Sequence, residues 1–279
     1  RGAFGQVGGI DIVEGSDVNL ERILLKYQMA FVSWSKLVRS PGLGGLRYCT
    51  RRSVSSSAGG TGSNLRLKLL VFLGSTRPNR MCTRVSSYVV RSLEQRGHQV
   101  EVVDPVELDL PLLRQPVFAY PAGKAPKVLL ELEDKIKAAD GYVIVSPEYN
   151  HSFSPAIGNT LSHFGGSCYA FKVSSIVTYS IGQFAGIRAA MSLRPFLSEL
   201  GCLPVSSIFS VAKVGEVFNA DGSFKDGQDE KRWDGYAAKC FGQLEWVGSA
   251  FKNHRQLVDP FSSSPPNEKM EDRYMPESK

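Results

Sequence analysis

Short apolar runs alternate with amphipathic segments along most of the chain between residues 67 and 251. A run of consecutive apolar residues is typical of a strand buried on both faces. Apolar residues spaced three and four apart indicate instead a helix with one buried side. These patterns predict strands at 67–73, 100–103, 142–145, 173–179 and 205–211. They predict helices at 80–96, 127–139, 155–163, 183–200 and 230–251.

This alternation predicts one domain of the doubly wound α/β class, built on a parallel sheet, over residues 65–254. Right-handed crossovers leave few topologies for five parallel strands, and we expect the flavodoxin-like strand order 2-1-3-4-5. Residues 110–126 contain four prolines and are predicted to form a loop. Pro195 lies inside the fourth helix and predicts a bend or a restart there.

The segments on either side of this domain differ from it in composition. Residues 1–64 are predicted to be a disordered leader, which ends in the Gly- and Ser-rich stretch 55–64. Within the leader, residues 29–57 hold five basic residues, many serines and no acidic residue, which is the composition of a mitochondrial transit peptide. We therefore expect a mitochondrial location, with the cytoplasm as the alternative if this stretch is only a basic leader. Residues 255–279 are rich in Pro, Ser, Glu and Lys and are predicted to be a disordered tail.

Composition excludes several classes of protein. No apolar run approaches the roughly 18 residues that a membrane span needs. The five cysteines include no CxxC pair, so neither a disulfide framework nor a structural metal site is expected. The net charge of +6 arises mainly from residues 29–64, which carry +5, whereas residues 65–254 carry 21 basic and 18 acidic residues. The folded part therefore has no predicted face for nucleic acid.

Three loops after predicted strands carry the candidate chemistry, because ligands of such sheets bind beyond the carboxyl ends of the strands. The first loop leads into a helix and offers small residues, hydroxyls, guanidinium groups and the free N–H groups of a helix start. These are the parts of a phosphate cradle, although neither a Walker A nor a GxGxxG pattern is present and an ordinary polar turn has similar residues. The candidate residues here are Gly74, Ser75, Thr76, Arg77, Asn79, Arg80, Cys82 and Thr83.

The second loop, residues 146–155, follows the third predicted strand. Its two prolines stiffen the backbone, so that main-chain polar groups can face a planar polar ring while Tyr149 covers one side of that ring. A rigid surface turn is the alternative, and a lone histidine such as His151 is more often a loop residue than a catalyst. The candidate residues are Pro147, Glu148, Tyr149, Asn150 and His151.

The third loop, residues 180–186, has two glycines around the predicted start of a helix. Glycine permits a close approach of the backbone to a ligand, and a plain helix cap is the alternative. Its candidate residues are Ser180, Gly182 and Gln183.

Two of these loops, GSTRPNR at 74–80 and SPEYNHSFSPAIGN at 146–159, resemble the NADPH-dependent FMN reductase family, which includes NAD(P)H:quinone and azo-dye reductases. The resemblance spans about residues 66–252 and implies FMN bound non-covalently in a flavodoxin-like fold. It implies that Ser75, Arg77 and the residues up to Thr83 hold the FMN phosphate. It further implies that the isoalloxazine ring is wrapped by Pro147, Glu148, Tyr149 and Asn150 and lined at its other edge by Ser180 and Gly182.

The resemblance also implies an activity. Hydride would pass from NADPH or NADH through FMN to a quinone or a similar small acceptor by a ping-pong mechanism. The flavin carries this chemistry, so no catalytic side chain is expected. Members of the family are usually homodimers or homotetramers, and the helix after the second loop would lie near the interface.

Two other functions remain open at this point. An FMN-binding redox sensor would be reduced slowly and would hold the reduced state, with partner choice set by the flavin. An electron carrier of the flavodoxin type is usually acidic, and the mildly basic composition of residues 65–254 disfavours it.

Overall fold

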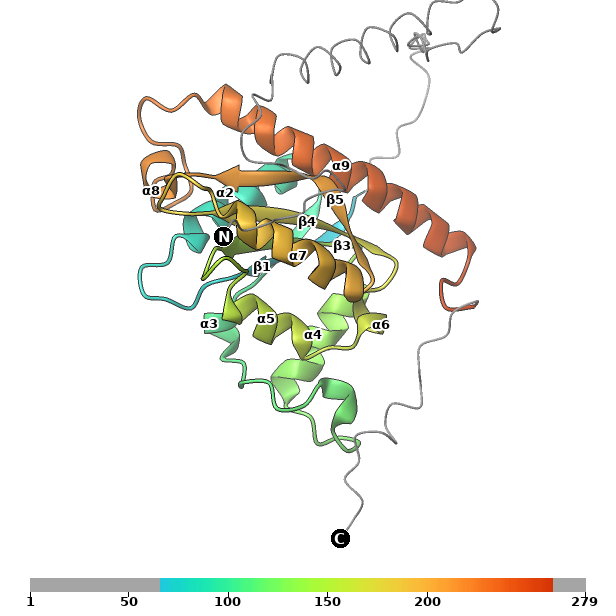
Figure 1. Ribbon diagram of the computed structural model, residues 1–279. Coiled ribbons are helices and arrows are strands. Elements are labelled where there is room, and N and C mark those ends of the chain that lie inside the picture. The colour runs from blue at the N-terminus through green and yellow to red at the C-terminus, as the bar shows by residue number, and fades with distance from the viewer. Residues whose placement is uncertain (1–65, 263–279) are drawn as a thin grey trace, which may run out of the picture. The chain divides into compact units, whose positions relative to one another are not determined.

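The computed structural model describes residues 66–262, so the leader segment 29–57 and most of the tail lie outside the described residues. The described part is an α/β domain around a five-stranded parallel sheet of order β2-β1-β3-β4-β5, which confirms the expected fold class and strand order (Figure 1). The strands are β1 (Lys68–Leu73), β2 (Gln99–Val103), β3 (Gly141–Pro147), β4 (Lys172–Tyr179) and β5 (Cys202–Val211).

Helices cover both faces of the sheet, and each face has its own hydrophobic core. One core includes apolar residues of α2 and α9, and the other includes those of α4, α5, α6 and α7. The helices of the described part are α2 (Cys82–Gln95), α3 (Pro105–Leu108), α4 (Lys127–Ala138), α5 (Pro155–Ser162), α6 (Gly166–Tyr169), α7 (Ile187–Glu199), α8 (Val214–Val217) and α9 (Glu230–Leu257), with a short 3-10 helix at Val117–Ala119.

The central strands are the most deeply buried elements. Every residue of β3 and of β4 is buried, because helices lie above and below them and other strands lie on both sides. This two-sided burial explains why apolar runs, rather than an alternating pattern, located these strands in the sequence. It also leaves only the ends of the strands available for polar chemistry.

Two helix boundaries differ from those expected by four residues or more. Helix α7 begins at Ile187 rather than at residue 183, because Ala185 and Gly186 adopt left-handed backbone conformations (φ 54° and 73°) that end the preceding turn. The helix then continues through Pro195 to Glu199, so the restart considered for this position does not occur. Helix α9 extends to Leu257, so residues 255–257 belong to the helix and not to the tail.

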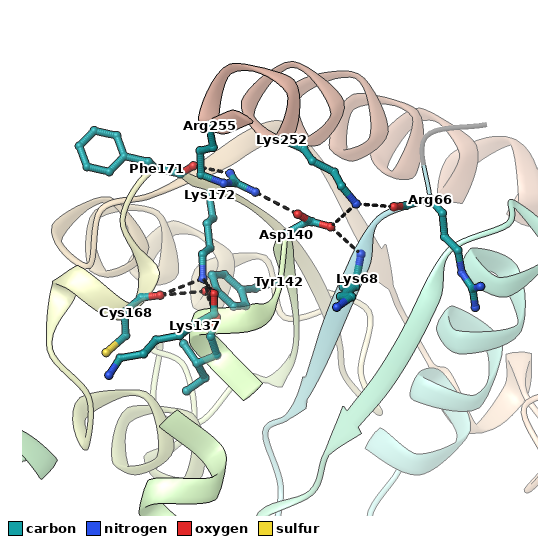
Figure 2. A network of polar contacts seen from close by, with 11 residues as sticks. Arg66, Lys68, Lys137, Asp140, Tyr142, Cys168, Phe171, Lys172, Lys252 and Arg255 are labelled. Carbon is teal, nitrogen blue, oxygen red and sulfur yellow. Dashed lines mark hydrogen bonds and ion pairs between the residues drawn. The ribbon is translucent and has the colours of Figure 1, made fainter. Parts of the chain in front are cut away.

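The C-terminal part of α9 is fastened to the amino end of the sheet by Asp140, which lies between α4 and β3. One carboxylate oxygen of Asp140 accepts a hydrogen bond from the backbone N–H of Lys68 (2.9 Å) and pairs with Lys252 Nζ (2.9 Å). The other oxygen pairs with Arg255 (3.0 Å). Figure 2 shows these contacts around Asp140. Lys252 also donates to the carbonyl of Arg66 (2.7 Å). One nearly buried carboxylate thus joins β1, β3 and α9.

A second basic group at this end of the sheet, the Lys172 ammonium, donates hydrogen bonds to carbonyls at the ends of two helices. Lys172 Nζ donates to the carbonyls of Ile136 (2.6 Å), Lys137 (2.8 Å) and Cys168 (3.1 Å), which lie near the C-termini of α4 and α6 (Figure 2). The last carbonyls of a helix lack the N–H groups of a following turn, so the ammonium supplies donors at this point; the Ile136 carbonyl also accepts from the Ala139 N–H (3.3 Å). Burial lowers the pKa of Lys172 to about 8, and the nearby positive charge of Arg255 adds to this effect.

We expect Asp140→Ala to lower the free energy of unfolding by about 2 kcal/mol, because it leaves the Lys68 N–H and two cations without their partner. Asp140→Asn should cost less, since the amide oxygen can still accept from Lys68. Urea denaturation measures both changes. The matched control is Glu131→Ala, which removes an exposed pair with Lys127 and should have the smallest effect of the three. Equal losses for Asp140→Ala and Glu131→Ala would contradict the role given to Asp140.

Candidate functional site

The carboxyl ends of β1, β3 and β4 carry three loops that meet around one cavity. Its volume of about 500 Å³ falls within the range of roughly 300–1,000 Å³ that small-molecule sites occupy. The cavity lies where the strand order reverses between β1 and β3, which is the usual ligand position in open α/β sheets. Its lining consists of Ser75, Arg77, Pro78, Asn79, Arg80, Met81, Pro147, Glu148, Tyr149, Asn150, Pro155, Tyr179, Ser180 and Ile181.

The first loop leaves β1 through a glycine that no larger residue can replace without movement. Gly74 N–H donates to the carbonyl of Val145 on β3 (2.8 Å). A Cβ atom at Gly74 would lie 2.8 Å from that carbonyl oxygen and 2.9 Å from Cγ1 of Ile157 on α5. The loop is therefore pressed against β3 and α5. This contact places Ser75, which is 3% exposed, at the cavity wall.

The start of α2 and Arg77 together form an anion-binding arrangement. Within the described chain no side chain caps this helix start, so the first N–H groups of α2 are left for another acceptor. The guanidinium of Arg77 lies 4.0 Å from the centre of the Tyr149 ring. Among the described residues it forms no ion pair with an acidic side chain. Arg77 is therefore the cationic group of this loop that a phosphate can use.

Arg80 also lines the cavity, but its guanidinium is already engaged. Both terminal nitrogens contact the carboxylate of Asp104, and one of them donates to the carbonyl of Ser75 (2.8 Å). The hydrogen bond with Asp104 raises the pKa of Arg80. Asp104 also accepts from Val106 N–H (2.9 Å) at the start of α3. Arg80 thus ties the first loop to the segment after β2, with both terminal nitrogens of its side chain directed at Asp104.

Four of the eight candidate residues of the first loop lie outside the cavity lining: Gly74, Thr76, Cys82 and Thr83. Thr76 is exposed, and the Thr83 hydroxyl donates to the carbonyl of Arg80 (3.0 Å). Cys82 is fully buried because it faces the core at the first turn of α2. Burial raises the pKa of this thiol to about 11, so it is protonated and unreactive at neutral pH.

The second loop is a tight β-hairpin, which the sequence did not reveal. Tyr149 and Ser152 exchange two backbone hydrogen bonds of 2.9 and 3.0 Å. The two residues between them, Asn150 and His151, both have positive φ (50° and 64°), as a type I′ turn requires. We call residues 147–154 the hairpin. Its short, closed backbone gives this wall of the cavity a defined shape.

Buried serines and a tyrosine fix the base and one side of the hairpin. The Ser146 hydroxyl donates to the carbonyl of Pro147 (2.8 Å) and accepts from Ser154 N–H (3.5 Å), and both serines are fully buried. The Tyr149 hydroxyl lies 3.2 Å from the Ser75 hydroxyl. The hairpin is therefore bonded to the first loop across the cavity wall.

The side chains of Glu148 and His151 turn toward α7. The Glu148 carboxylate lies 2.5 Å from Arg188 Nε, and His151 Nε2 lies 2.7 Å from a terminal nitrogen of Arg188. Glu148 still lines the cavity, whereas His151 does not. Arg188 was not among the expected residues, although its place two residues after the Gly186 turn was a usable signal.

The third loop contributes less than expected. Ser180 and Ile181 line the cavity, whereas Gly182 and Gln183 are exposed and do not. The Ser180 hydroxyl donates to the carbonyl of Gly182 (2.8 Å), which closes this turn on itself. Pro78 and Met81, which also line the cavity, fall within the range up to Thr83 that the resemblance implied. The lining residues that sequence reasoning missed are Pro155, at the end of the second loop, and Tyr179 and Ile181, on either side of Ser180.

This geometry agrees with comparisons to known proteins. Residues 67–216 match the family model of the NADPH-dependent FMN reductases. The chain belongs to this family. It is 27% identical over 170 residues to an FMN-dependent NADPH-azoreductase of Staphylococcus saprophyticus, covering 58% of this chain and 82% of that protein. It is 32% identical over 136 residues to a probable NADPH:quinone oxidoreductase 1 of Oryza sativa subsp. japonica, covering 47% and 68%.

A solved structure shows the same fold. The flavoenzyme NAD(P)H:(acceptor) oxidoreductase FerB of Paracoccus denitrificans superposes with a TM-score of 0.54 at 22% identity, covering 65% of this chain and 98% of that chain. As a member of the NADPH-dependent FMN reductase family, the protein is an oxidoreductase with FMN as cofactor and NAD(P)H as electron donor.

The described residues fit FMN. The uncapped start of α2 and Arg77 suit a phosphate, and the hairpin next to them offers backbone polar groups and an aromatic ring for a planar heterocycle. Bound FMN supplies the hydride chemistry, so the protein has to hold and orient it. No group of three His, Cys, Asp or Glu side chains in residues 66–262 could hold a metal ion. No helix in this range is long and apolar enough to cross a membrane.

We expect Gly74→Ala to weaken FMN binding at least tenfold and to destabilise the protein, because the new methyl group pushes the first loop away from β3 and α5. Quenching of FMN fluorescence by the apoprotein measures the affinity, and thermal unfolding measures the stability. Gly235→Ala is the matched control. Its Cβ meets nothing within 4 Å on α9, so it should leave FMN affinity unchanged and raise stability by about 1 kcal/mol. Unchanged FMN affinity in Gly74→Ala would contradict this account of the loop.

Proposed function

We propose that the protein transfers hydride from NAD(P)H through FMN to quinones or similar planar acceptors by a ping-pong mechanism. The observation that carries this proposal is the single cavity at the meeting point of the three loops. A planar cofactor seated against the hairpin leaves one ring face for both donor and acceptor, so they have to bind in turn. The names of two relatives, a quinone oxidoreductase and an NADPH azoreductase of a Bacillus species, support conjugated acceptors.

In this proposal the first loop and the hairpin have separate tasks. Arg77 and the N–H groups at the start of α2 hold the phosphate. The backbone of the hairpin faces the polar edge of the ring, where preorganised N–H groups stabilise added negative charge. The side chain of Tyr149 keeps water from one part of the cavity wall.

We also propose that two or more copies assemble. Supporting this, α7 and the turn before it expose the large apolar side chains of Phe184 (58%), Ile187 (40%) and Met191 (50%). Such side chains gathered next to a site favour contact with another protein surface.

Steady-state kinetics tests the proposed mechanism. With NADPH varied at several fixed quinone concentrations, we expect parallel double-reciprocal lines, because the first product leaves before the quinone binds. Lines that intersect would show that both substrates are bound together and would contradict the proposal. In an anaerobic mixture without acceptor, NADPH should bleach the flavin absorbance, and added quinone should restore it at the rate of turnover. Slow recovery would favour the redox sensor instead.

We expect Arg77→Ala to weaken FMN binding by about 10- to 100-fold, which is the value of one charge-assisted hydrogen bond to a phosphate. The rate of flavin reduction at saturating FMN should stay within about twofold, since in this proposal the guanidinium serves the phosphate and takes no part in hydride transfer. Fluorescence titration and stopped-flow reduction measure these two quantities. Arg66→Ala, which removes an exposed arginine before the opposite end of β1, is the control and should change neither. Wild-type FMN affinity in Arg77→Ala would remove its phosphate role.

A further inference from the structure

Helix α7 holds the hairpin at two successive turns of one helix face. Arg188 and Ser192 are four residues apart on α7 and therefore point the same way. Arg188 contacts Glu148 and His151 on the hairpin. The Ser192 hydroxyl accepts from Phe153 N–H (3.1 Å) and lies 3.2 Å from the Ser152 hydroxyl.

The contact between Glu148 and Arg188 is a helix cap as well as an ion pair. Gly186 precedes α7 in a left-handed conformation and has no side chain to cap the helix. The carboxylate of Glu148 takes over this task, because it accepts the backbone N–H of Arg188 at 3.1 Å while the other oxygen pairs with Arg188 Nε. An anion at this position is also favoured by the helix dipole. The start of α7 and the hairpin thus stabilise each other.

Burial makes this pairing necessary for the carboxylate. The side chain of Glu148 is 9% exposed, whereas that of Arg188 is 40% exposed. A carboxylate removed from water needs a compensating charge and hydrogen bonds. Among the described residues, Arg188 is the basic side chain that pairs with Glu148. Without it, a nearly buried carboxylate at the cavity wall would lose its charged partner.

His151 adds a second reason for the contact. Its positive φ of 64° is unfavourable for a residue with a β-carbon, so surrounding contacts have to hold it there. A guanidinium can only donate hydrogen bonds, so His151 Nε2 accepts from Arg188 and the ring proton lies on Nδ1. This bond fixes the tip of the turn. The Arg188 guanidinium also lies over the Phe184 ring at 5.1 Å, which limits its own motion.

We propose that Arg188 is a positioning residue for the FMN site: it locks the hairpin in the shape that presents Tyr149 and Asn150 to the cavity. It acts through Glu148 and His151 and does not itself line the cavity. Its Nε faces the Glu148 carboxylate and one terminal nitrogen bonds His151, so the guanidinium is directed at the hairpin and not into the cavity. The inference rests on the fit of FMN to the cavity and is independent of the acceptor and of the ping-pong mechanism.

The test compares Arg188→Gln with Arg194→Gln. Arg194 lies on the same helix and donates to the carbonyls of Val205 and Ser206, away from the cavity. We expect Arg188→Gln to weaken FMN binding at least tenfold in fluorescence titration. In the apoprotein it should also speed amide hydrogen exchange at Tyr149 and Ser152 at least tenfold. Arg194→Gln should leave both quantities within about twofold of wild type.

Two further variants grade the effect. Arg188→Lys keeps a charge for Glu148 but cannot also reach His151, so it should recover part of the FMN affinity. Ser192→Ala removes the acceptor of the Phe153 N–H, so it should raise exchange at Phe153 but should raise exchange at Tyr149 and Ser152 by less than Arg188→Gln does.

Three results would overturn the proposal. The first is wild-type FMN affinity together with wild-type exchange in Arg188→Gln. The second is unchanged FMN affinity with a raised KM for NADPH, which would make Arg188 a substrate-binding residue. If Arg188→Gln fails to fold, Glu148→Gln decides, because its amide oxygen can still cap α7 while the ion pair is lost. Wild-type FMN affinity in Glu148→Gln is the third overturning result, and a loss of at least fivefold together with faster amide exchange at Tyr149 and Ser152 in the apoprotein supports the proposal.

Discussion

Burial of the central strands on both faces is the constraint on which the rest of the structure depends. With β3 and β4 wholly enclosed, the charged side chains around them lie at the two ends of the sheet. The amino end holds a charged network around Asp140 that fastens α9, and the carboxyl end holds the cavity. Stability and chemistry therefore belong to opposite ends of the same strands, and a change at one end can leave the other intact.

The cavity wall depends on contacts between segments far apart in the sequence. Gly74 brings the first loop against β3, Arg80 joins it to Asp104, and Arg188 joins the hairpin to α7. Each of these contacts between segments depends on a charged side chain or on a close backbone approach, and not on a large apolar surface. The polar side chains around the cavity thus divide into a few that face it and others that hold those few in place.

The sequence predicted the sheet and its order well, because two-sided burial leaves continuous apolar runs that are easy to recognise. It placed the cavity correctly at three strand ends. It did not reveal the hairpin, because the turn is Asn150-His151 and not the Asn-Gly pair that usually marks a type I′ turn. It also could not separate Arg77 from Arg80, since only the folded chain brings Asp104 to one of them. The start of α7 was predicted four residues too early, at 183, because the sequence does not show that Ala185 adopts a left-handed backbone conformation.

The contacts that shape the hairpin are all made by other residues of the same chain and none needs a ligand. Ser146 bonds Ser154 at its base, Tyr149 contacts Ser75 at its side, and Arg188 and Ser192 hold it along α7. The conformational entropy of this segment is therefore lost when the protein folds, so cofactor binding does not have to order it and its free energy is not reduced by that cost. A cofactor can bind to such a preformed site in one step, without a conformational change of the protein. In a cell where free FMN is scarce, such a site would fill at a rate set by diffusion and by the charge of Arg77, without waiting for a loop to close.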